Sequence, residues 1–250
     1  MLNRERIVAQ LNSDRYVQGL ILGDTADSTN AKVRQMALHG AAEGVTMIVD
    51  HQTAGRGRRG RTFHSPEGGL YLSTLIRPQE PIDPGLITCR AAVAAARAIE
   101  SLCDLKIDVK WVNDLYLNDH KVAGILAEGV LSSAGELTAV VIGIGINVGV
   151  TVFPDELDAI ATSLGNEGAS IHREDLAAAF LNEWERVQTD PDWLEEYRRR
   201  NLVLRREVMV VQGDKTQTAT AVRITDRGHL VVHTADGERI LSSGEVSVRL

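Results

Sequence analysis

The chain has 250 residues, of which 44% are hydrophobic and 24% are charged. This length and hydrophobic content predict one large domain, or one domain with a small appendage, and they exclude an intrinsically disordered chain. The formal net charge of -7 argues against a protein that binds nucleic acid over its whole surface, although it is compatible with a local basic patch.

Taken in chain order, a helix is predicted at residues 4–11, a strand at 17–22, a helix at 30–39 and strands at 46–51 and 70–76. An alanine-rich helix at 86–102 is followed by strands at 109–111, 115–117, 121–128 and 137–146, and then by helices at 157–164, 174–188 and 192–201. Because strands and helices do not alternate strictly, the fold class expected is α+β.

The sequence changes in character after Asn201. Short strand-like runs occur at residues 208–211, 218–224, 230–233, 239–241 and 246–248, and turn-forming residues separate them. Several short strands at close spacing are typical of a small β-barrel. We therefore expect two domains, at residues 1–203 and 204–250.

Cysteine usage and hydropathy indicate the compartment. Cys89 and Cys103 lie outside any CxxC or Cys/His pattern, so we expect reduced thiols and no zinc site. The first residues, which include Arg4, Glu5 and Arg6, lack the apolar run of a signal peptide. The most apolar later stretch, residues 139–153, is broken by glycines and is shorter than the ~20 residues of a membrane helix. A cytoplasmic protein without a membrane partner is expected.

Residues 55–61 read Gly-Arg-Gly-Arg-Arg-Gly-Arg. Glycine lets a backbone approach a ligand closely, and arginine pairs with phosphate or carboxylate oxygens. The segment suits a phosphorylated, anionic ligand, but a solvated basic loop or a contact to nucleic acid explains it equally well. It also matches G-x-G-x-x-G. The residues that follow, 62–69, cannot form the helix that a dinucleotide-binding motif requires, so that reading is excluded.

Three further clusters have both a functional and a purely structural interpretation. Lys110-Trp111-Val112-Asn113-Asp114, with Lys121, offers phosphate and magnesium ligands, or is an exposed charged hairpin turning at Asn118-Asp119. Gly143-Ile144-Gly145-Ile146-Asn147 offers close approach and a base-reading amide, or is a bulge and turn. Asp27-Ser28-Thr29-Asn30 begins the helix at 30–39, and capping alone explains it.

Taken together, these motifs resemble the biotin–protein ligase family. The ordered segments are DSTN, QTAGRGRRGR, KWVNDLYLNDHKVAGIL and IGIGINV, and the resemblance spans about residues 25 to 150. It implies a central mixed sheet with flanking helices, related to class II synthetases, and a small SH3-like C-terminal β-barrel. Some relatives carry an N-terminal DNA-binding domain; 26 residues precede Asp27 here, so we expect the form without it.

The resemblance implies an AMP-forming ligase that uses ATP, biotin and Mg²⁺. Biotin becomes biotinyl-5′-AMP and is then transferred to a lysine of a biotin carboxyl carrier domain, of acetyl-CoA carboxylase or another biotin-dependent carboxylase. A homodimer is expected, and no nucleic-acid partner. The alternatives are a lipoate–protein ligase of the same broad fold and, in a different class, a nucleic-acid-binding protein that uses its basic loop.

The resemblance also assigns roles to individual residues. It places the biotin end of the site at Ser28, Thr29, Asn30, Gln52, Gly55, Arg56, Gly57, Arg58, Lys121 and Gly124. It places the nucleotide end at Arg58, Arg61, Phe63, Lys110, Asn113, Gly143 and Asn147. Arg58, Lys110 and Lys121 are the expected catalytic cations, and Asp114 is the expected Mg²⁺ ligand.

The chain departs from the family pattern at two positions. Val112 stands where the family usually has proline, and Phe63 stands where some relatives have tryptophan. Val112 removes no chemical group from the site, so we expect activity to survive. Phe63 can still stack on adenine, over a smaller area. Residues 52–69 are expected to be mobile without ligand and to become ordered when biotin or the adenylate binds.

Overall fold

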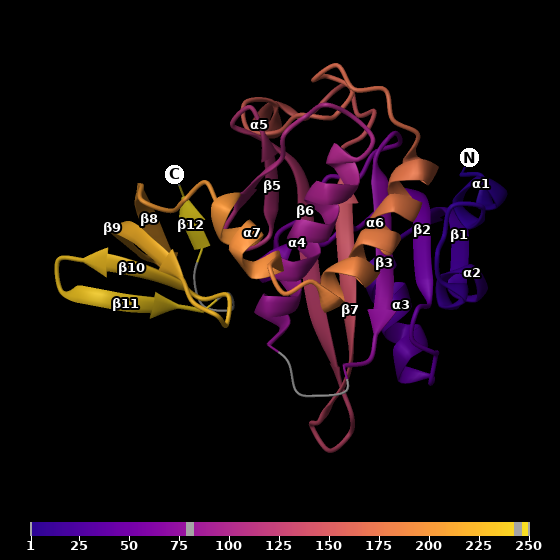
Figure 1. Cartoon of the computed structure of the whole chain (residues 1–250), viewed down its shortest axis with the longest axis horizontal. Coiled ribbons are helices and arrows are strands. Elements are labelled where there is room, and N and C mark those ends of the chain that lie inside the picture. Colours follow the sequence, from indigo (N-terminus) through magenta and orange to yellow (C-terminus); the bar gives the residue numbers. More distant parts are fainter. Residues whose placement is uncertain (1, 79–82, 243–246, 250) are drawn as a thin grey trace.

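The computed structural model describes residues 2–78, 83–242 and 247–249. The described strands form a seven-stranded sheet in the body of the protein and a five-stranded sheet near the C-terminus. Figure 1 shows the smaller sheet beside the end of the larger one that carries β5 and α7.

The large sheet is mixed, as the sequence predicts. Its strands are β1 (Leu20–Ala26), β2 (Thr46–Gln52), β3 (Leu70–Ile76), β4 (Asp108–Lys110), β5 (Asp114–Leu117), β6 (His120–Leu131) and β7 (Leu137–Ile146). They are arranged in the order β1-β2-β3-β7-β6-β5-β4. Strands β1 and β2 are parallel and the other neighbours are antiparallel. Strand β3 is an interior strand between β2 and β7 and is buried along its whole length, which agrees with its mostly apolar sequence.

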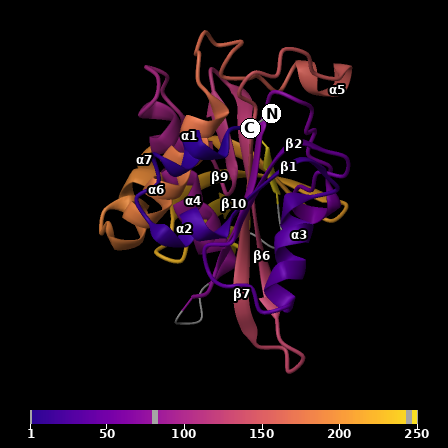
Figure 2. The same ribbon diagram turned by 90° about the vertical axis from the view of Figure 1, so that its right-hand side faces the viewer.

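Helices cover both faces of this sheet. They are α1 (Arg4–Val8), α2 (Asp14–Gly19), α3 (Thr29–Leu38), α4 (Pro84–Glu100), α5 (Asp155–Asp158), α6 (Arg173–Thr189) and α7 (Trp193–Arg199). Figure 2 shows α3 on one face and α4 and α6 on the other. The alanines of α4 are fully buried, and their short side chains let α4 pack closely between the sheet and α6. Among the described residues, no helix has the length and apolarity needed to cross a membrane.

The five strands of the small sheet agree with the expected SH3-like domain. They are β8 (Glu207–Gln212), β9 (Lys215–Ile224), β10 (Leu230–Thr234), β11 (Gly237–Leu241) and β12 (Ser247–Arg249), in the order β11-β10-β9-β8-β12. Residue 246 of the last predicted strand lies outside the described residues. The sheet is joined to the body by a 2.9 Å hydrogen bond from Trp111 Nε1 to the Gly228 carbonyl. The boundary at residue 204 stays a prediction.

Two predicted elements are wrong. Residues 14–19 form helix α2, and the strand predicted at 17–22 starts only at Leu20. Ser13 precedes this helix at the N-cap position, and Tyr16 is its buried residue. The helix predicted at 157–164 ends at Asp158, because residues 160–162 pair instead with Lys121. The Lys121 N–H donates to the Ile160 carbonyl at 2.8 Å, and its own carbonyl accepts from Thr162 N–H at 2.9 Å.

Candidate active site

A cavity of about 710 Å³ opens at the N-terminal end of α3. Its walls come from the start of α3, the end of β2, the loop after β2, and strands β4 to β7. This volume lies within the range of ~300–1,000 Å³ that is usual for small-molecule sites. Fifteen residues with predicted roles line it: Ser28, Thr29, Asn30, Gln52, Arg56, Gly57, Arg58, Arg61, Phe63, Lys110, Asn113, Asp114, Lys121, Gly124 and Gly143.

Uncharged hydrogen-bonding groups form one end of the cavity. Helix α3 begins at Thr29, one residue before the predicted start, with Ser28 as its N-cap. The Thr29 N–H and Oγ1 donate to Gln52 Oε1 at 2.9 and 3.1 Å, and Gln52 Nε2 donates to Ser65 Oγ at 2.9 Å. The free N–H groups of a first helical turn are thus partly satisfied by a side chain from β2. Ser28, Thr29 and Gln52 all line the cavity.

Asn30 extends this network to strands β6 and β7. Its Nδ2 donates to Glu128 Oε2 at 2.8 Å and to the Leu126 carbonyl at 3.2 Å, while its Oδ1 lies 2.6 Å from Ser73 Oγ. The side chain lies directly on Gly143, where a Cβ atom would overlap Asn30 Oδ1. Gly143 therefore allows close approach, as predicted, and the group that approaches is Asn30.

Cationic groups gather around the middle and the other end of the cavity. Lys121 Nζ lies 2.7 Å from Asp114 Oδ1. Arg58 Nη1 donates to Asn113 Oδ1 at 3.0 Å, and burial lowers the pKa of Arg58, although a guanidinium stays charged at neutral pH. Lys110 Nζ lies 5.3 Å from the centre of the Tyr116 ring. Three cations and one carboxylate make this part of the cavity electropositive, which suits phosphate oxygens.

Phe63 forms an apolar surface between these two regions. Its ring lies against Gly124 and Gly145, and a Cβ atom at Gly145 would overlap the ring. Lys121 Nζ is 5.8 Å from the ring centre, and Tyr71 meets the ring edge-on at 6.5 Å. The glycines of β6 and β7 thus make room for an aromatic side chain contributed by the loop.

Two residues with predicted roles lie outside the cavity wall. Gly55 is at the base of the loop, where a Cβ atom would overlap the Phe63 carbonyl oxygen. Asn147 is buried, and its Nδ2 donates to the Thr162 carbonyl at 3.0 Å. Asn147 therefore joins the end of β7 to residue 162 and does not present its amide to the cavity. A base-reading role has no support from this position.

Other residues of the site were not predicted. Ser73 and Glu128 belong to the Asn30 network, and Tyr116 and Ile160 line the cavity. A serine in the otherwise apolar run of β3 was a usable signal, because a buried hydroxyl needs a partner. Ile160 gave no local signal. Val112 is buried and its carbonyl accepts from Tyr197 Oη at 3.0 Å, and the Trp111–Val112 peptide bond is cis.

A magnesium ion fits this cavity only when a bound substrate supplies phosphate oxygens as further ligands. Among the described residues there is no group of three or more His, Cys, Asp and Glu side chains able to hold a metal. Asp114 is the carboxylate on the cavity wall, and it is paired with Lys121. Mg²⁺ is usually held by one or two carboxylates together with substrate phosphates. Asp114 can be such a carboxylate.

Comparisons with known proteins agree with this arrangement. Residues 22–147 match the Biotin/lipoate A/B protein ligase family, and residues 204–249 match the Biotin protein ligase C terminal domain. The bifunctional ligase/repressor BirA of Bacillus subtilis is 40% identical over 167 residues, which are 65% of this chain and 51% of that protein. The chain thus spans about half the length of that relative.

Two further relatives are matched over most of their length. Biotin--[acetyl-CoA-carboxylase] ligase of Mycobacterium tuberculosis is 33% identical over 233 residues, with 88% of this chain and 85% of that protein covered. The solved structure of biotin protein ligase from Aquifex aeolicus in complex with biotin and ATP has a TM-score of 0.81 and 28% identity, and the match covers 93% of this chain and 99% of that one. From these matches and the cavity, the chain belongs to the biotin protein ligase family.

Proposed function

We propose that this protein activates biotin with ATP to biotinyl-5′-AMP and transfers the biotinyl group to a lysine of a biotin carboxyl carrier domain. The observation that carries the proposal is the division of one cavity into an uncharged hydrogen-bonding end and an electropositive region. A ligand that fits both must have a neutral polar head and an anionic tail. Biotin has this shape, and its adenylate extends the anionic part.

The uncharged end is assigned to the ureido ring of biotin. This ring has two N–H donors and one carbonyl acceptor and carries no charge. Ser28, Thr29, Asn30 and Gln52 supply matching donors and acceptors, and their mutual hydrogen bonds hold them in place before the ligand arrives. Such preorganisation lowers the entropic cost of binding.

In the first step, a carboxylate oxygen of biotin forms a bond to the α-phosphorus of ATP, and the bond to pyrophosphate breaks. Both reactants are anionic, so the repulsion between them must be offset. We assign this role to Lys121 and Arg58, and contact with the leaving pyrophosphate to Lys110; all three line the cavity. Asp114 would hold a magnesium ion bound together with the nucleotide, and the ion would offset further phosphate charge.

In the second step, the uncharged ε-amine of the carrier lysine attacks the acyl carbon. The bond from that carbon to the phosphate oxygen breaks, AMP leaves, and the nitrogen loses a proton to solvent as the amide forms. Arg58 and Lys121 stabilise the departing phosphate. The adenylate is hydrolysable, so the loop that carries Arg58 and Phe63 is assigned to exclude water from it.

Labelling of a purified carrier domain tests the proposal. With ATP and biotin, we expect its mass to rise by one biotinyl group, with AMP and pyrophosphate as co-products. Omission of ATP, or replacement of the acceptor lysine by alanine, should abolish the change. Because the matched family includes lipoate ligases, lipoate is the control substrate. Labelling with lipoate in place of biotin would overturn the assignment.

The partner rests on the same proposal. The Mycobacterium tuberculosis relative is named as a ligase for acetyl-CoA carboxylase, which supports the carrier subunit of that enzyme as the acceptor. The homodimer and the cytoplasmic location stay predictions.

A further inference from the structure

A second groove, of about 240 Å³, lies beside the cavity on the outer side of α3. It is lined by Asp27, Ala31, Lys32, Arg34, Gln35 and Arg56. Arg56 lines both the groove and the cavity, so the two form one continuous surface. The loop adds Arg59 and Arg61, which are exposed at the cavity. We call Lys32, Arg34, Arg56, Arg59 and Arg61 the basic rim.

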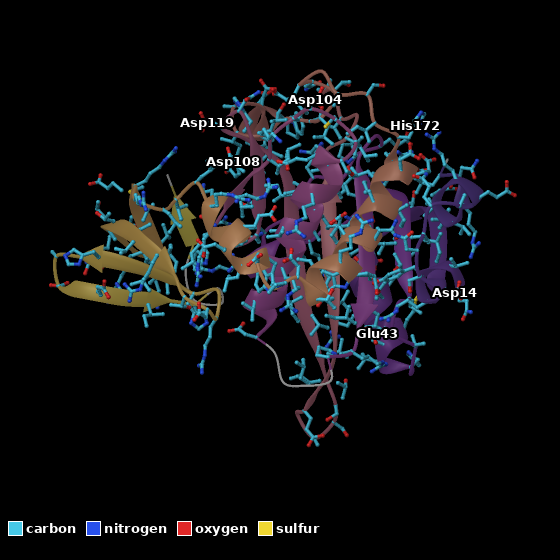
Figure 3. All side chains as sticks on the ribbon, viewed as in Figure 1. Asp14, Glu43, Asp104, Asp108, Asp119 and His172 are labelled. Carbon is cyan, nitrogen blue, oxygen red and sulfur yellow. The ribbon has the colours of Figure 1, made fainter. Side chains whose placement is uncertain are left out.

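The basic rim is rich in cationic side chains, whereas the molecule as a whole is acidic. The whole chain carries -7. Exposed carboxylates include Asp104 and Asp119 along the upper edge in Figure 3 and Asp14 on its right-hand side. In the rim, Lys32 pairs with Asp27 at 3.3 Å and Arg56 pairs with Glu128 at 3.2 Å.

Within the described residues, Arg34 and Arg61 have no ion pair. Their charge is therefore available to a partner.

We propose that the basic rim is the docking surface for the carrier domain, which it recognises through carboxylates that flank the acceptor lysine. This proposal rests on the function proposed above. The acceptor lysine is itself cationic before it loses its proton, so a positive mouth repels an isolated lysine. A lysine surrounded by carboxylates is attracted instead. Positive charge around the opening of the cavity therefore favours lysines that are flanked by carboxylates and disfavours isolated lysines.

Nucleic acid is the other polyanion that a basic surface attracts. The chain has a pI near 5.5, whereas nucleic-acid-binding domains are typically basic overall. Beyond the rim, the surface carries the exposed carboxylates described above, which would repel a long phosphate backbone. A compact acidic protein that contacts only the mouth avoids that repulsion. The charge distribution thus favours a protein partner.

The test uses a charge reversal outside the catalytic cavity. Lys32→Glu with Arg34→Glu inverts the groove, and Lys106→Glu with Arg199→Glu makes the same change in net charge at two exposed positions elsewhere. We expect kcat/KM for the carrier domain to fall about tenfold or more in the rim variant and to change less than about twofold in the control, because surface charges act mainly on the rate of encounter. Equal losses in both variants, or no loss in either, would overturn the proposal.

Biotin-dependent exchange between ATP and pyrophosphate separates this proposal from the underlying function. The exchange needs no carrier and should be unchanged in the rim variant. Absence of exchange in the unmodified protein would defeat the proposed function itself. If the rim variant misfolds and loses exchange, the salt dependence of the unmodified protein still tests the proposal. Its kcat/KM for the carrier should fall with added salt while the exchange rate stays level, and a carrier rate that is independent of salt overturns the docking surface.

A last measurement, binding to random-sequence DNA, tests the alternative partner. Loss of binding to random-sequence DNA in the rim variant, with carrier kinetics unchanged, would reassign the rim to nucleic acid.

Discussion

Gly143→Ala tests whether Asn30 is held against β7 as the structure indicates. A methyl group at Gly143 would overlap Asn30 Oδ1, so Asn30 has to move. Asn30 is 4% exposed and would lose its contacts at 2.6 Å to Ser73 and at 2.8 Å to Glu128. A buried polar group left without its partner costs about 1–3 kcal/mol. Because some relaxation of β7 offsets the loss of two contacts, we expect the free energy of unfolding to fall by about 3 kcal/mol.

Thermal unfolding and calorimetric titration with biotin measure this effect. For a chain of this size the melting temperature should fall by about 6–12 °C, and biotin affinity should fall more than about tenfold, since each tenfold corresponds to about 1.4 kcal/mol. Gly23→Ala in β1 is the matched control, because its Cβ would lie 3.6 Å from the nearest atom, Val49 Cγ1. If the two variants have the same melting temperature and bind biotin as tightly as the parent, a glycine at position 143 is not needed to hold Asn30 in place.

Three other changes give distinct results. Lys121→Ala should slow biotin-dependent pyrophosphate release by well over about tenfold, as lost electrostatic stabilisation often costs about 2.7–4 kcal/mol; an unchanged rate would refute its role. Arg58→Gly removes the guanidinium that contacts Asn113 and should let biotinyl-5′-AMP escape, which chromatography of the filtrate detects; equal retention would contradict this. The hydrogen bond from Arg6 lowers the pKa of Asp175 from 3.8 to about 2. A lowered carboxyl pKa stabilises the fold above pH 3.8, and this stability is lost as pH falls toward about 2. Asp175→Asn should therefore flatten the acid-unfolding curve in that interval, and a curve as steep as the parent's would exclude the pair as a stabilising contact.

The four ordered motifs come together as their order along the chain predicts. They lie at the start of α3, in the loop after β2, along β4 to β6 and at the end of β7. Elements at these positions carry local signals, such as the Ser28 N-cap of α3 and the apolar runs of β3 and β7. The cavity residues were found through the family resemblance of the four motifs taken together, because the Gly/Arg loop by itself is explained equally well by a solvated basic loop.

Two differences from what the local sequence suggests have a common physical cause. Asn147 has the motif position of a ligand-binding amide, but it bonds to Thr162. Residues 160–162 lie within the helix predicted at 157–164, but they pair with the backbone of Lys121. In both, a hydrogen-bond partner far away along the chain replaced the local one, and no local pattern encodes such a partner.

Sequence alone therefore determined the elements, the family resemblance and most of the cavity wall, because these depend on side-chain periodicity and on motifs of neighbouring residues. Tertiary structure alone decided which polar groups face the cavity, since that depends on pairings between distant segments. It also decided that Lys32 and Arg34 of α3 lie beside the arginines of the loop. That juxtaposition follows from packing α3 against the sheet, and it creates the positive mouth of an otherwise acidic protein.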